Sequence, residues 1–282
     1  MHDPLDLEYT CPLPEGEIKY GLRGSGPPVL LIMGFMARGR AWRAQVEALA
    51  PYYTVLWFDH QGVGDSLGPA AKTMSEFASD CLHLLDHLAW TKAHVIGISM
   101  GGMIAQEFAV TYPERVSSLA LIVTHFGAWH RVIPPMRGIP LFLKAQFAKS
   151  MPKRLEALKE LLVPQSVLAT ADHELILSKL REDFSPKPPF ATRYRHIRAI
   201  LGHNTQKRLK NLTKACLVIQ AQEDLLVNPK HSLSLHKAIP NAKLVSFEEA
   251  GHGIVRQSNI SVSEHLLQHL QEVEEQNAEQ SL

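Results

Sequence analysis

The sequence predicts an α/β protein with a mostly parallel, doubly wound sheet and a helical cap inserted between two strands. Short β-rich apolar runs alternate with stretches whose apolar residues recur at helical spacing, as in a sheet with helices on both faces. The run Glu17–Arg23 is followed by a Gly-Ser-Gly-Pro turn, which predicts an antiparallel edge strand. Residues 125–212 break the alternation, because they contain helix-period segments and no convincing strand.

Each parallel strand is predicted from one apolar run. Between the runs, apolar residues recur at three- and four-residue intervals over residues 77–88 and over residues 262–273, which predicts two amphipathic helices. The predicted strands are Val29–Met33, Thr54–Asp59, His94–Ile98, Ser118–Thr124, Cys216–Gln220 and Lys243–Phe247.

The interruption between the fourth and fifth of these strands is predicted to be the cap. Its helix-period segments are separated by prolines, which mark helix ends and loops. The chain therefore divides into a core, residues 1–124 and 213–282, and a cap, residues 125–212. The predicted helical segments of the cap are Leu141–Met151, Arg154–Leu162, Glu174–Arg181 and Arg193–Leu201.

Length and composition indicate an ordinary soluble globular protein. The 282 residues are 45% hydrophobic and 20% charged, and no run approaches the roughly 18 apolar residues of a membrane span. Residues 1–6 lack the basic and apolar regions of a secretory signal. Three cysteines without metal-type spacing suggest neither disulfides nor a zinc site, and no nucleotide fingerprint is present. We therefore expect a cytoplasmic protein with no metal and no cofactor.

The charge is unevenly distributed along the chain. The 29 basic and 28 acidic residues give a formal net charge of +1, which argues against a nucleic-acid partner. The cap alone has 16 basic and 6 acidic residues, and the remainder has 13 and 22, so a cap of charge +10 accompanies a core of charge −9. The net charge of the whole chain is near zero because the positive charge of the cap and the negative charge of the core cancel.

The segment Leu141–Met151 leaves two interpretations of the basic cap open. It is predicted to be an amphipathic helix with an apolar face of Leu143, Phe147 and Met151 and lysines elsewhere. In the first interpretation this face packs over the active site, as amphipathic helices usually cover a core. In the second, the cap meets a negatively charged substrate or an anionic lipid surface, which would place the protein peripherally on a membrane.

The strongest local motif is G-x-S-x-G within Gly97–Gly102, which lies between a predicted strand and a helix-like stretch. A tight strand-to-helix turn strains the serine backbone and exposes its hydroxyl, and glycines at Gly97 and Gly101 let neighbouring main chain approach. Ser99 is therefore the candidate nucleophile. The turn also places the N–H of Met100 at a helix N-terminus, where a developing negative charge is stabilised.

A serine nucleophile requires a histidine base and a carboxylate that orients it. His252 lies between two glycines after the last predicted strand, on the edge where this architecture places its active site. Asp224 follows the preceding strand, and the order Ser, Asp, His is the one expected for the motif. Glu223 competes with Asp224, and His125 and His203, which border the cap, remain open as alternatives.

A second backbone donor for an oxyanion is expected in the turn after the first parallel strand. Gly34 lets the chain turn so that the N–H of Phe35 points at the serine and acts with the N–H of Met100. The alternative is a simple connection from strand to helix. Four aromatic residues near the cap boundaries either line an apolar pocket or form the core of the cap: Phe126, Trp129, Phe184 and Phe190.

Together these segments resemble the α/β-hydrolase fold superfamily, from about Tyr20 to Leu270, with the weakest match in the cap. The resemblance is closest to the single-domain esterase, lipase and peptidase-like members. It implies the nucleophile Ser99, the base His252, its orienting acid Asp224 and the oxyanion donors Phe35 and Met100. The segments that carry it are Gly97–Gly102, Asp224 with Pro229 following, Gly251-His252-Gly253 and Asp59–Ser66.

Two residues depart from the family pattern. Met33 stands where many members have histidine, and Gln61 stands where the loop usually carries arginine. The change at Met33 is compatible with activity, because the expected oxyanion donor is a main-chain N–H. Ser99 itself disfavours the haloalkane dehalogenases and epoxide hydrolases, whose alkyl-enzyme ester requires a carboxylate nucleophile.

The sequence therefore predicts a serine hydrolase that cleaves a small to medium carboxylic ester through an acyl-enzyme intermediate. Its expected partner is a small-molecule ester. Two alternatives remain. One is a non-catalytic or slow-turnover ligand receptor or scaffold on the same fold, and the other is an acyltransferase or carbon–carbon bond hydrolase with the same triad.

Overall fold

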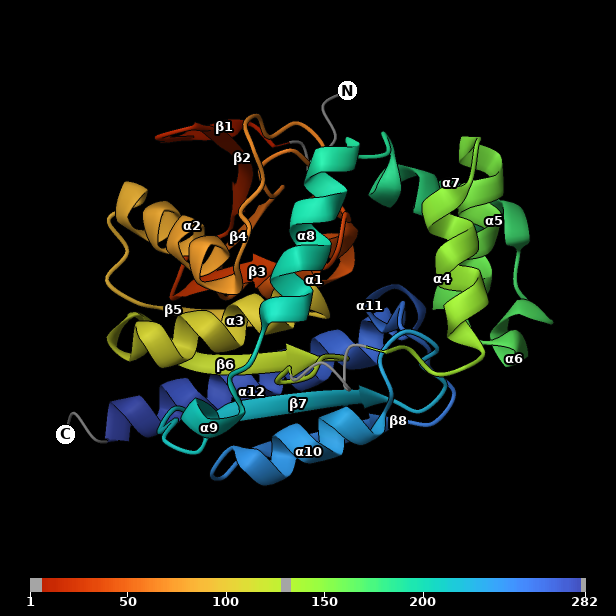
Figure 1. Cartoon of the computed structure of the whole chain (residues 1–282). Coiled ribbons are helices and arrows are strands. Elements are labelled where there is room, and N and C mark those ends of the chain that lie inside the picture. The colour runs from red at the N-terminus through yellow and green to blue at the C-terminus, as the bar shows by residue number, and fades with distance from the viewer. Residues whose placement is uncertain (1–6, 128–132, 280–282) are drawn as a thin grey trace.

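The computed structural model describes residues 7–127 and 133–279. Their strands form one eight-stranded sheet, with helices packed around it (Figure 1). The strand order is β1-β2-β4-β3-β5-β6-β7-β8. β1 and β2 are antiparallel to their neighbours, and the other strands run parallel. The strands are β1 (Tyr9–Leu13), β2 (Gly16–Arg23), β3 (Pro28–Ile32), β4 (Thr54–Phe58), β5 (Ala93–Ile98), β6 (Val116–Ile122), β7 (Cys216–Ala221) and β8 (Lys243–Phe247).

The predicted sheet is confirmed, with one strand missed. All six predicted parallel strands are present with bounds within two residues of those expected, and the antiparallel strand Glu17–Arg23 is β2. The sequence missed β1, a half-exposed edge strand that pairs with β2 and carries no continuous apolar run. The interpretation of residues 1–6 as lacking a secretory signal lies outside the described residues.

Helices cover both faces of the sheet, as a doubly wound fold requires. The face that carries α2 (Met74–His87), α3 (Met100–Thr111) and α10 (Lys230–Ala238) has one hydrophobic core, and the face of α1 (Arg43–Leu49) and α12 (Asn259–Glu279) has another. The predicted apolar stripes of α2 and α12 are buried in these cores. Three short helical turns complete the core: η1 (Gly39–Trp42), η2 (Pro113–Arg115) and α11 (Ile254–Gln257).

The described residues between β6 and β7 are helical and have a small hydrophobic core of their own. Helices α4, α5 and α7 lie at the end of the sheet toward which β6 and β7 point, and α8 crosses beside the sheet (Figure 1). The cap therefore stands at the carboxyl ends of the parallel strands. Its helices are α4 (Gly138–Phe147), α5 (Met151–Leu162), α6 (Gln165–Leu168), α7 (His173–Phe184), α8 (Phe190–Gly202) and α9 (Gln206–Leu209).

The single helix predicted over Leu141–Met151 is wrong, because the chain breaks there into two helices. α4 ends at Phe147, and α5 starts at Met151 with a proline in its first turn, where proline's fixed φ suits a helix start. Met151 packs against the core of the cap. Leu143 and Phe147 instead face solvent, with 47% and 78% of their surface exposed, so the expected apolar face does not cover the active site.

The cap is fastened to the core beside the loop that follows β3. At the end of α7, Asp183 is buried and forms an ion pair with Arg256 of α11, with Arg256 Nε 3.0 Å from Oδ2. Its carbonyl accepts a hydrogen bond of 2.8 Å from the N–H of Arg38. Burial raises the pKa of Asp183, and the Arg256 guanidinium opposes that shift. At the other end of the cap, Arg208 pairs with both carboxylate oxygens of Glu107 in α3.

No helix in the described ranges, 7–127 and 133–279, is both long and apolar enough to cross a membrane.

Candidate active site

Ser99 occupies the turn between β5 and α3 in a backbone conformation that side chains rarely adopt. Its φ is 55° and its ψ is −120°. Hydrogen bonds from the neighbouring strand hold this conformation: Ser99 N donates to Ile122 O at 2.9 Å, and the Thr124 hydroxyl donates to Ser99 O at 2.7 Å. Such strain persists only where the surroundings over-determine it, and it is concentrated at functional sites.

Two glycines permit the tight packing of this turn. A Cβ on Gly97 would lie 2.3 Å from Gly101 O, and a Cβ on Gly101 would lie 2.1 Å from Ile32 O. Both contacts are with main chain, which cannot move aside without breaking the sheet or the helix. The small residues expected at these positions are therefore required by the close approach of β3, β5 and α3.

The structure brings together the three residues that the sequence singled out as a triad. The Ser99 hydroxyl lies 2.9 Å from His252 Nε2, and His252 Nδ1 lies 2.7 Å from Asp224 Oδ2. All three side chains are buried. The second oxygen of Asp224 accepts hydrogen bonds from the N–H groups of Leu226 and Val227 at 2.7 and 2.8 Å, which hold the carboxylate toward the histidine.

The competing candidates lie elsewhere. Glu223 is exposed and accepts a hydrogen bond from the hydroxyl of Ser166 in the cap. The His125 ring accepts a hydrogen bond from the N–H of Gly127 and lies 6.4 Å from the ring of His203. Neither histidine lines the cavity that contains Ser99. The geometry therefore favours Asp224 and His252 over these alternatives.

Both expected oxyanion donors lie beside the serine. Met100 is the first residue of α3, so its N–H has no partner within the helix. Phe35 follows β3 and lines the same cavity as Ser99. Gly34 brings this loop close, since a Cβ there would lie 3.1 Å from Ser99 Cβ.

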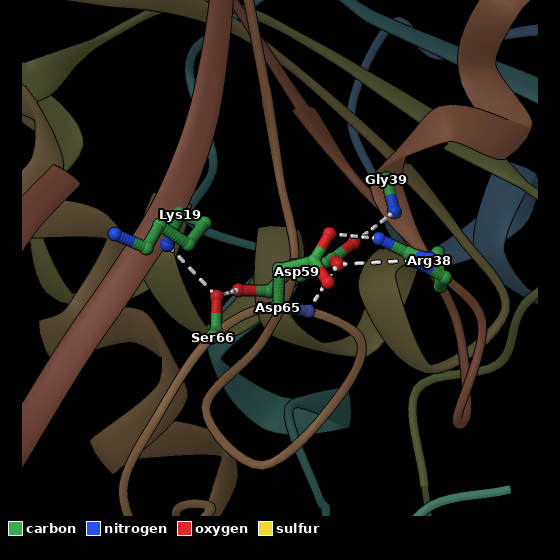
Figure 2. Close-up of polar contacts among 6 residues, drawn as sticks. All are labelled: Lys19, Arg38, Gly39, Asp59, Asp65 and Ser66. Atoms are coloured by element: carbon green, nitrogen blue, oxygen red, sulfur yellow. Dashed lines mark hydrogen bonds and ion pairs between the residues drawn. The ribbon is translucent and has the colours of Figure 1, made fainter. Parts of the chain in front are cut away.

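A buried carboxylate anchors the loop that carries Phe35 (Figure 2). Asp59, at the end of β4, accepts hydrogen bonds from Gly39 N at 2.6 Å, from Arg38 Nε at 3.3 Å and from Asp65 N at 3.1 Å. Ser66 donates to its carbonyl at 2.6 Å. Burial raises the pKa of Asp59, and Arg38 opposes that shift. From the sequence alone, Asp59–Ser66 contributes to the resemblance to α/β-hydrolases, but no role for these residues could be predicted.

A histidine that the sequence analysis did not single out packs on Phe35. His196 of α8 lies 5.9 Å from the Phe35 ring, 5.2 Å from the Phe77 ring and 6.0 Å from the His60 ring. His60, in turn, hydrogen-bonds to Met33 O at 3.0 Å. Burial lowers the pKa of His196 to about 3 and that of His60 to about 4. No local motif marks His196, because its contacts are made only when the cap folds onto the core.

Ser99 and His252 open onto a cavity of about 240 Å³ between core and cap. Of the four aromatic residues expected there, Phe184 lines the cavity, Phe126 is buried in the core, Phe190 is largely exposed, and Trp129 lies outside the described residues. The wall is mainly apolar and comes from both parts of the chain. Its larger apolar members include Met33, Phe35, Ile98, Phe142, Leu158, Leu162, Ile176, Leu180, Phe184, Leu226 and Val255.

Within the described ranges, no group of three or more histidine, cysteine, aspartate or glutamate side chains is placed to hold a metal ion.

Fold and site together define a hydrolase of the α/β type, with Ser99 on a tight turn after a central parallel strand. A family model for the alpha/beta hydrolase fold matches residues 27–255, and the chain belongs to that family. Curated relatives include proteins named "Putative carbamate hydrolase RutD". The one from Azorhizobium caulinodans is 27% identical over 84% of this chain and 89% of its own length, and the one from Stutzerimonas stutzeri is 27% identical over 91% and 96%.

Solved structures show the same fold. A thermophilic esterase from Thermogutta terrifontis is 26% identical, with a TM-score of 0.79 over 94% of this chain and 97% of its own. An enol-lactonase from Burkholderia xenovorans has a TM-score of 0.78 at 23% identity, covering 91% and 97%. At that lower identity the likeness speaks for the fold alone.

Replacing Asp59 tests the anchoring of the Phe35 loop. Asp59→Ala leaves Arg38 and the N–H of Gly39 without their buried partner, so we expect the free energy of unfolding to fall by about 2–4 kcal/mol. We also expect kcat of hydrolysis to fall about tenfold or more, because the loop no longer holds its place. Asp65→Ala is the matched control, since Asp65 is exposed and pairs with the same arginine. Equal effects of the two substitutions would contradict the anchoring role.

The buried His196 predicts a pH-dependent stability. Its pKa in the folded protein is about 3, below the ordinary value of 6.5, so the folded state binds fewer protons than the unfolded state between these values. The free energy of unfolding therefore falls as the pH is lowered from about 6.5, by up to about 1.4 kcal/mol per pH unit for this group. His196→Phe, which keeps the ring contacts, is expected to reduce that slope accordingly. Urea unfolding between pH 7 and pH 4.5 measures it, and an unchanged slope would refute the prediction.

Proposed function

We propose that this protein is a serine hydrolase that cleaves small to medium carboxylic esters through a Ser99–His252–Asp224 triad. The observation that carries the proposal is the continuous hydrogen-bond chain from the Ser99 hydroxyl through His252 to Asp224, in the wall of an apolar cavity. That arrangement is recognised by geometry and roles on many folds. The family membership of the chain supports a hydrolytic activity.

In the first step, His252 Nε2 takes the proton of Ser99 as the oxygen attacks the ester carbonyl. Asp224 accepts the Nδ1–H of His252, which selects the tautomer whose Nε2 is free to act as base, and stabilises the imidazolium that forms. The imidazolium then gives its proton to the leaving alcohol. Water, deprotonated by the same histidine, attacks the acyl-enzyme and releases the carboxylic acid and Ser99.

The negative charge that develops on the carbonyl oxygen is received by the N–H groups of Phe35 and Met100. Backbone donors placed in advance are effective because they need no reorganisation during the reaction, and losing one costs about 10²–10³ in rate in other enzymes. Because these donors are main-chain groups, the methionine at Met33 in place of the family's usual histidine leaves the mechanism intact.

The cavity wall supports an apolar acyl or alcohol group as the preferred substrate part. The names of the curated relatives suggest a second candidate reaction, the hydrolysis of a carbamate. A small polar carbamate would leave most of the apolar cavity unfilled, whereas each methylene that a substrate buries there contributes about 0.8 kcal/mol. We therefore place esters with apolar groups ahead of carbamates.

Two alternative functions use the same residues. A ligand receptor would bind its ligand in the cavity without turnover. An acyltransferase or a carbon–carbon bond hydrolase would have the same triad and would differ in the acceptor or in the bond that is broken. Labelling of Ser99 separates the receptor from the enzymes, and product analysis separates the enzymes from one another.

Replacing the nucleophile tests the triad directly. Ser99→Ala should lower kcat of p-nitrophenyl ester hydrolysis by at least about 10³-fold and abolish covalent labelling by a fluorophosphonate probe. Asp224→Asn should also lower kcat by orders of magnitude, because the histidine loses its orienting carboxylate. Glu223→Gln, one position away on an exposed side chain, is the matched control and should retain wild-type activity. Full hydrolysis by Ser99→Ala would exclude the proposed mechanism.

A graded series of substrates tests the preference for apolar groups. We expect kcat/KM of p-nitrophenyl esters to rise about fourfold per methylene as the acyl chain lengthens from acetyl, until the cavity is full. The carbamate of the same phenol should be a poorer substrate than the medium-chain esters. The opposite ranking, with the carbamate hydrolysed fastest, would favour the reaction named for the relatives.

A further inference from the structure

The cations of the cap are segregated along the sequence. All six acidic residues of the cap lie between Glu156 and Asp183. Residues 125–155 hold 6 basic and no acidic residues, and residues 184–212 hold 7 basic and no acidic residues. The positive charge of the cap is therefore concentrated in two purely basic stretches, one containing α4 and the start of α5, the other containing α8.

The fold joins these two stretches at the C-terminal end of α4. Lys187 Nζ donates to Gln146 O at 2.8 Å and lies 3.5 Å from Ala148 O, and Arg193 Nη1 lies 3.3 Å from the same Gln146 O. The two cations thus converge on the main chain beside Phe147. Segments that are 40 residues apart in the sequence form one continuous basic face.

Large apolar side chains project from the same face. Phe147 and Leu143 lie one helical turn apart on α4, and both are exposed. At the start of α8, Phe190 is 73% exposed and stacks with the exposed Tyr194, and the Arg193 guanidinium lies 5.6 Å from the Phe190 ring. We call these four apolar residues, with Lys144, Lys149, Lys187 and Arg193, the basic aromatic face.

The cations of this face lack acidic partners. Elsewhere in the cap Lys159 pairs with Glu156, and Arg208 with Glu107. In the described part of the chain, none of the four cations of the basic aromatic face lies within 4.0 Å of a carboxylate. Intramolecular pairing therefore leaves their charge uncompensated.

A buried arginine behind the face adds further positive charge. Arg154 is 1% exposed, its Nη1 donates to Phe184 O at 2.6 Å, and its Nε and Nη2 have no hydrogen-bond partner among the described residues. Burial lowers the pKa of Arg154 to about 10, and the nearby Arg193 adds to that shift. Burial also lowers the pKa of Lys187, with further contributions from Arg193 and Arg154. An uncompensated buried charge is costly, and a nearby anion would offset that cost.

We propose that the basic aromatic face docks on an anionic lipid surface, with Phe147 and Phe190 inserted among the acyl chains and the exposed Lys144 and Lys149 on the headgroups. Lys187 and Arg193, which bond to the end of α4, add positive charge directly behind them. Positive charge and exposed apolar side chains on the same surface are the two features that interfacial binding requires, and here α4 and α8 together supply both. A purely electrostatic partner, such as an acidic polypeptide, would leave the exposure of Phe147 and Phe190 without a role.

Docking in this way places the cavity beside the lipid. Phe142 and Gln146, on the inward side of α4, line the cavity, whereas Leu143 and Phe147 face outward from the same helix. One helix therefore separates the surface from the site. The docking stands apart from the proposed catalysis, because it uses none of the triad residues.

Vesicle flotation tests the proposal with the full chain. Wild-type protein should bind vesicles of phosphatidylcholine with phosphatidylglycerol, should bind phosphatidylcholine alone much more weakly, and should dissociate as salt is raised. Lys144→Glu with Lys149→Glu should weaken the partition coefficient by at least about tenfold, since each cation near an anionic surface contributes about fivefold. Ser99→Ala should bind as the wild type does, which keeps the outcome independent of catalysis.

Matched controls separate the face from overall charge and overall hydrophobicity. Lys92→Glu with Lys237→Glu changes the net charge equally on exposed core positions, and Ile260→Ser removes an apolar side chain that is 69% exposed on α12. Neither should reduce vesicle binding as far as the cap variants do, whereas Phe147→Ser should. Unchanged thermal unfolding will show that each variant is folded, and unchanged hydrolysis of a soluble ester will confirm it for every variant except Ser99→Ala.

Three outcomes would overturn the proposal. Equal binding to neutral and anionic vesicles removes the charge argument. An equal loss of vesicle binding in the cap and core double variants would show that binding depends only on net charge. Binding to polyglutamate that persists in Phe147→Ser, with no binding to vesicles, identifies an acidic polypeptide as the partner instead.

Discussion

The strained turn at Ser99 is the constraint on which the rest of the site depends. The positive φ of Ser99 is sustained by hydrogen bonds from the end of β6 and by glycines that let β3, β5 and α3 approach closely. The strands β3, β5 and β6 and the helix α3 must therefore all be in place to hold the serine in this conformation. The same packing places the N–H of Met100 at a helix start, so the proposed nucleophile and one proposed oxyanion donor arise from a single local structure.

Phe35 couples the core to the cap. Its backbone belongs to the loop that Asp59 and Arg38 anchor, whereas its ring packs against Phe142 of α4 and His196 of α8. A movement of the cap would therefore directly reach Phe35, one of the two proposed oxyanion donors. Asp183 strengthens this coupling, because it bonds to the backbone at Arg38 through its carbonyl and to the helix that follows His252 through its carboxylate.

The distribution of charge follows the division of the chain into core and cap. The core uses its acidic residues partly in buried networks such as that of Asp59, and the cap keeps its acidic residues in the helices between Glu156 and Asp183. The remaining cap cations have no such partners on the described surface around α4 and α8. A net charge near zero thus conceals a basic face on one part of the molecule.

Much of the fold and of the candidate triad was predictable, because strands, glycine turns and their order leave local signatures in the sequence. The apolar runs located six parallel strands, and the loops after β5, β7 and β8 identified Ser99, Asp224 and His252 as candidates. The sequence did not predict β1, because a half-exposed edge strand need not contain an apolar run. The break between α4 and α5 was not predicted, because the apolar residues keep their helical spacing across it. In the structure the proline in the first turn of α5 starts a new helix.

The sequence by itself determined the secondary structure of the core and the chemical character of the site, since both depend on residue type and short-range spacing. The tertiary structure decided which carboxylate faces His252, how His196 supports Phe35, and which side of α4 meets solvent. Each of these depends on contacts between segments that are distant in the chain, and no local pattern encodes the direction in which a side chain meets such a neighbour. Leu143 and Phe147 show the difference most clearly: their spacing predicted an apolar helix face and left open whether that face is covered, and the packing of the cap leaves both side chains exposed.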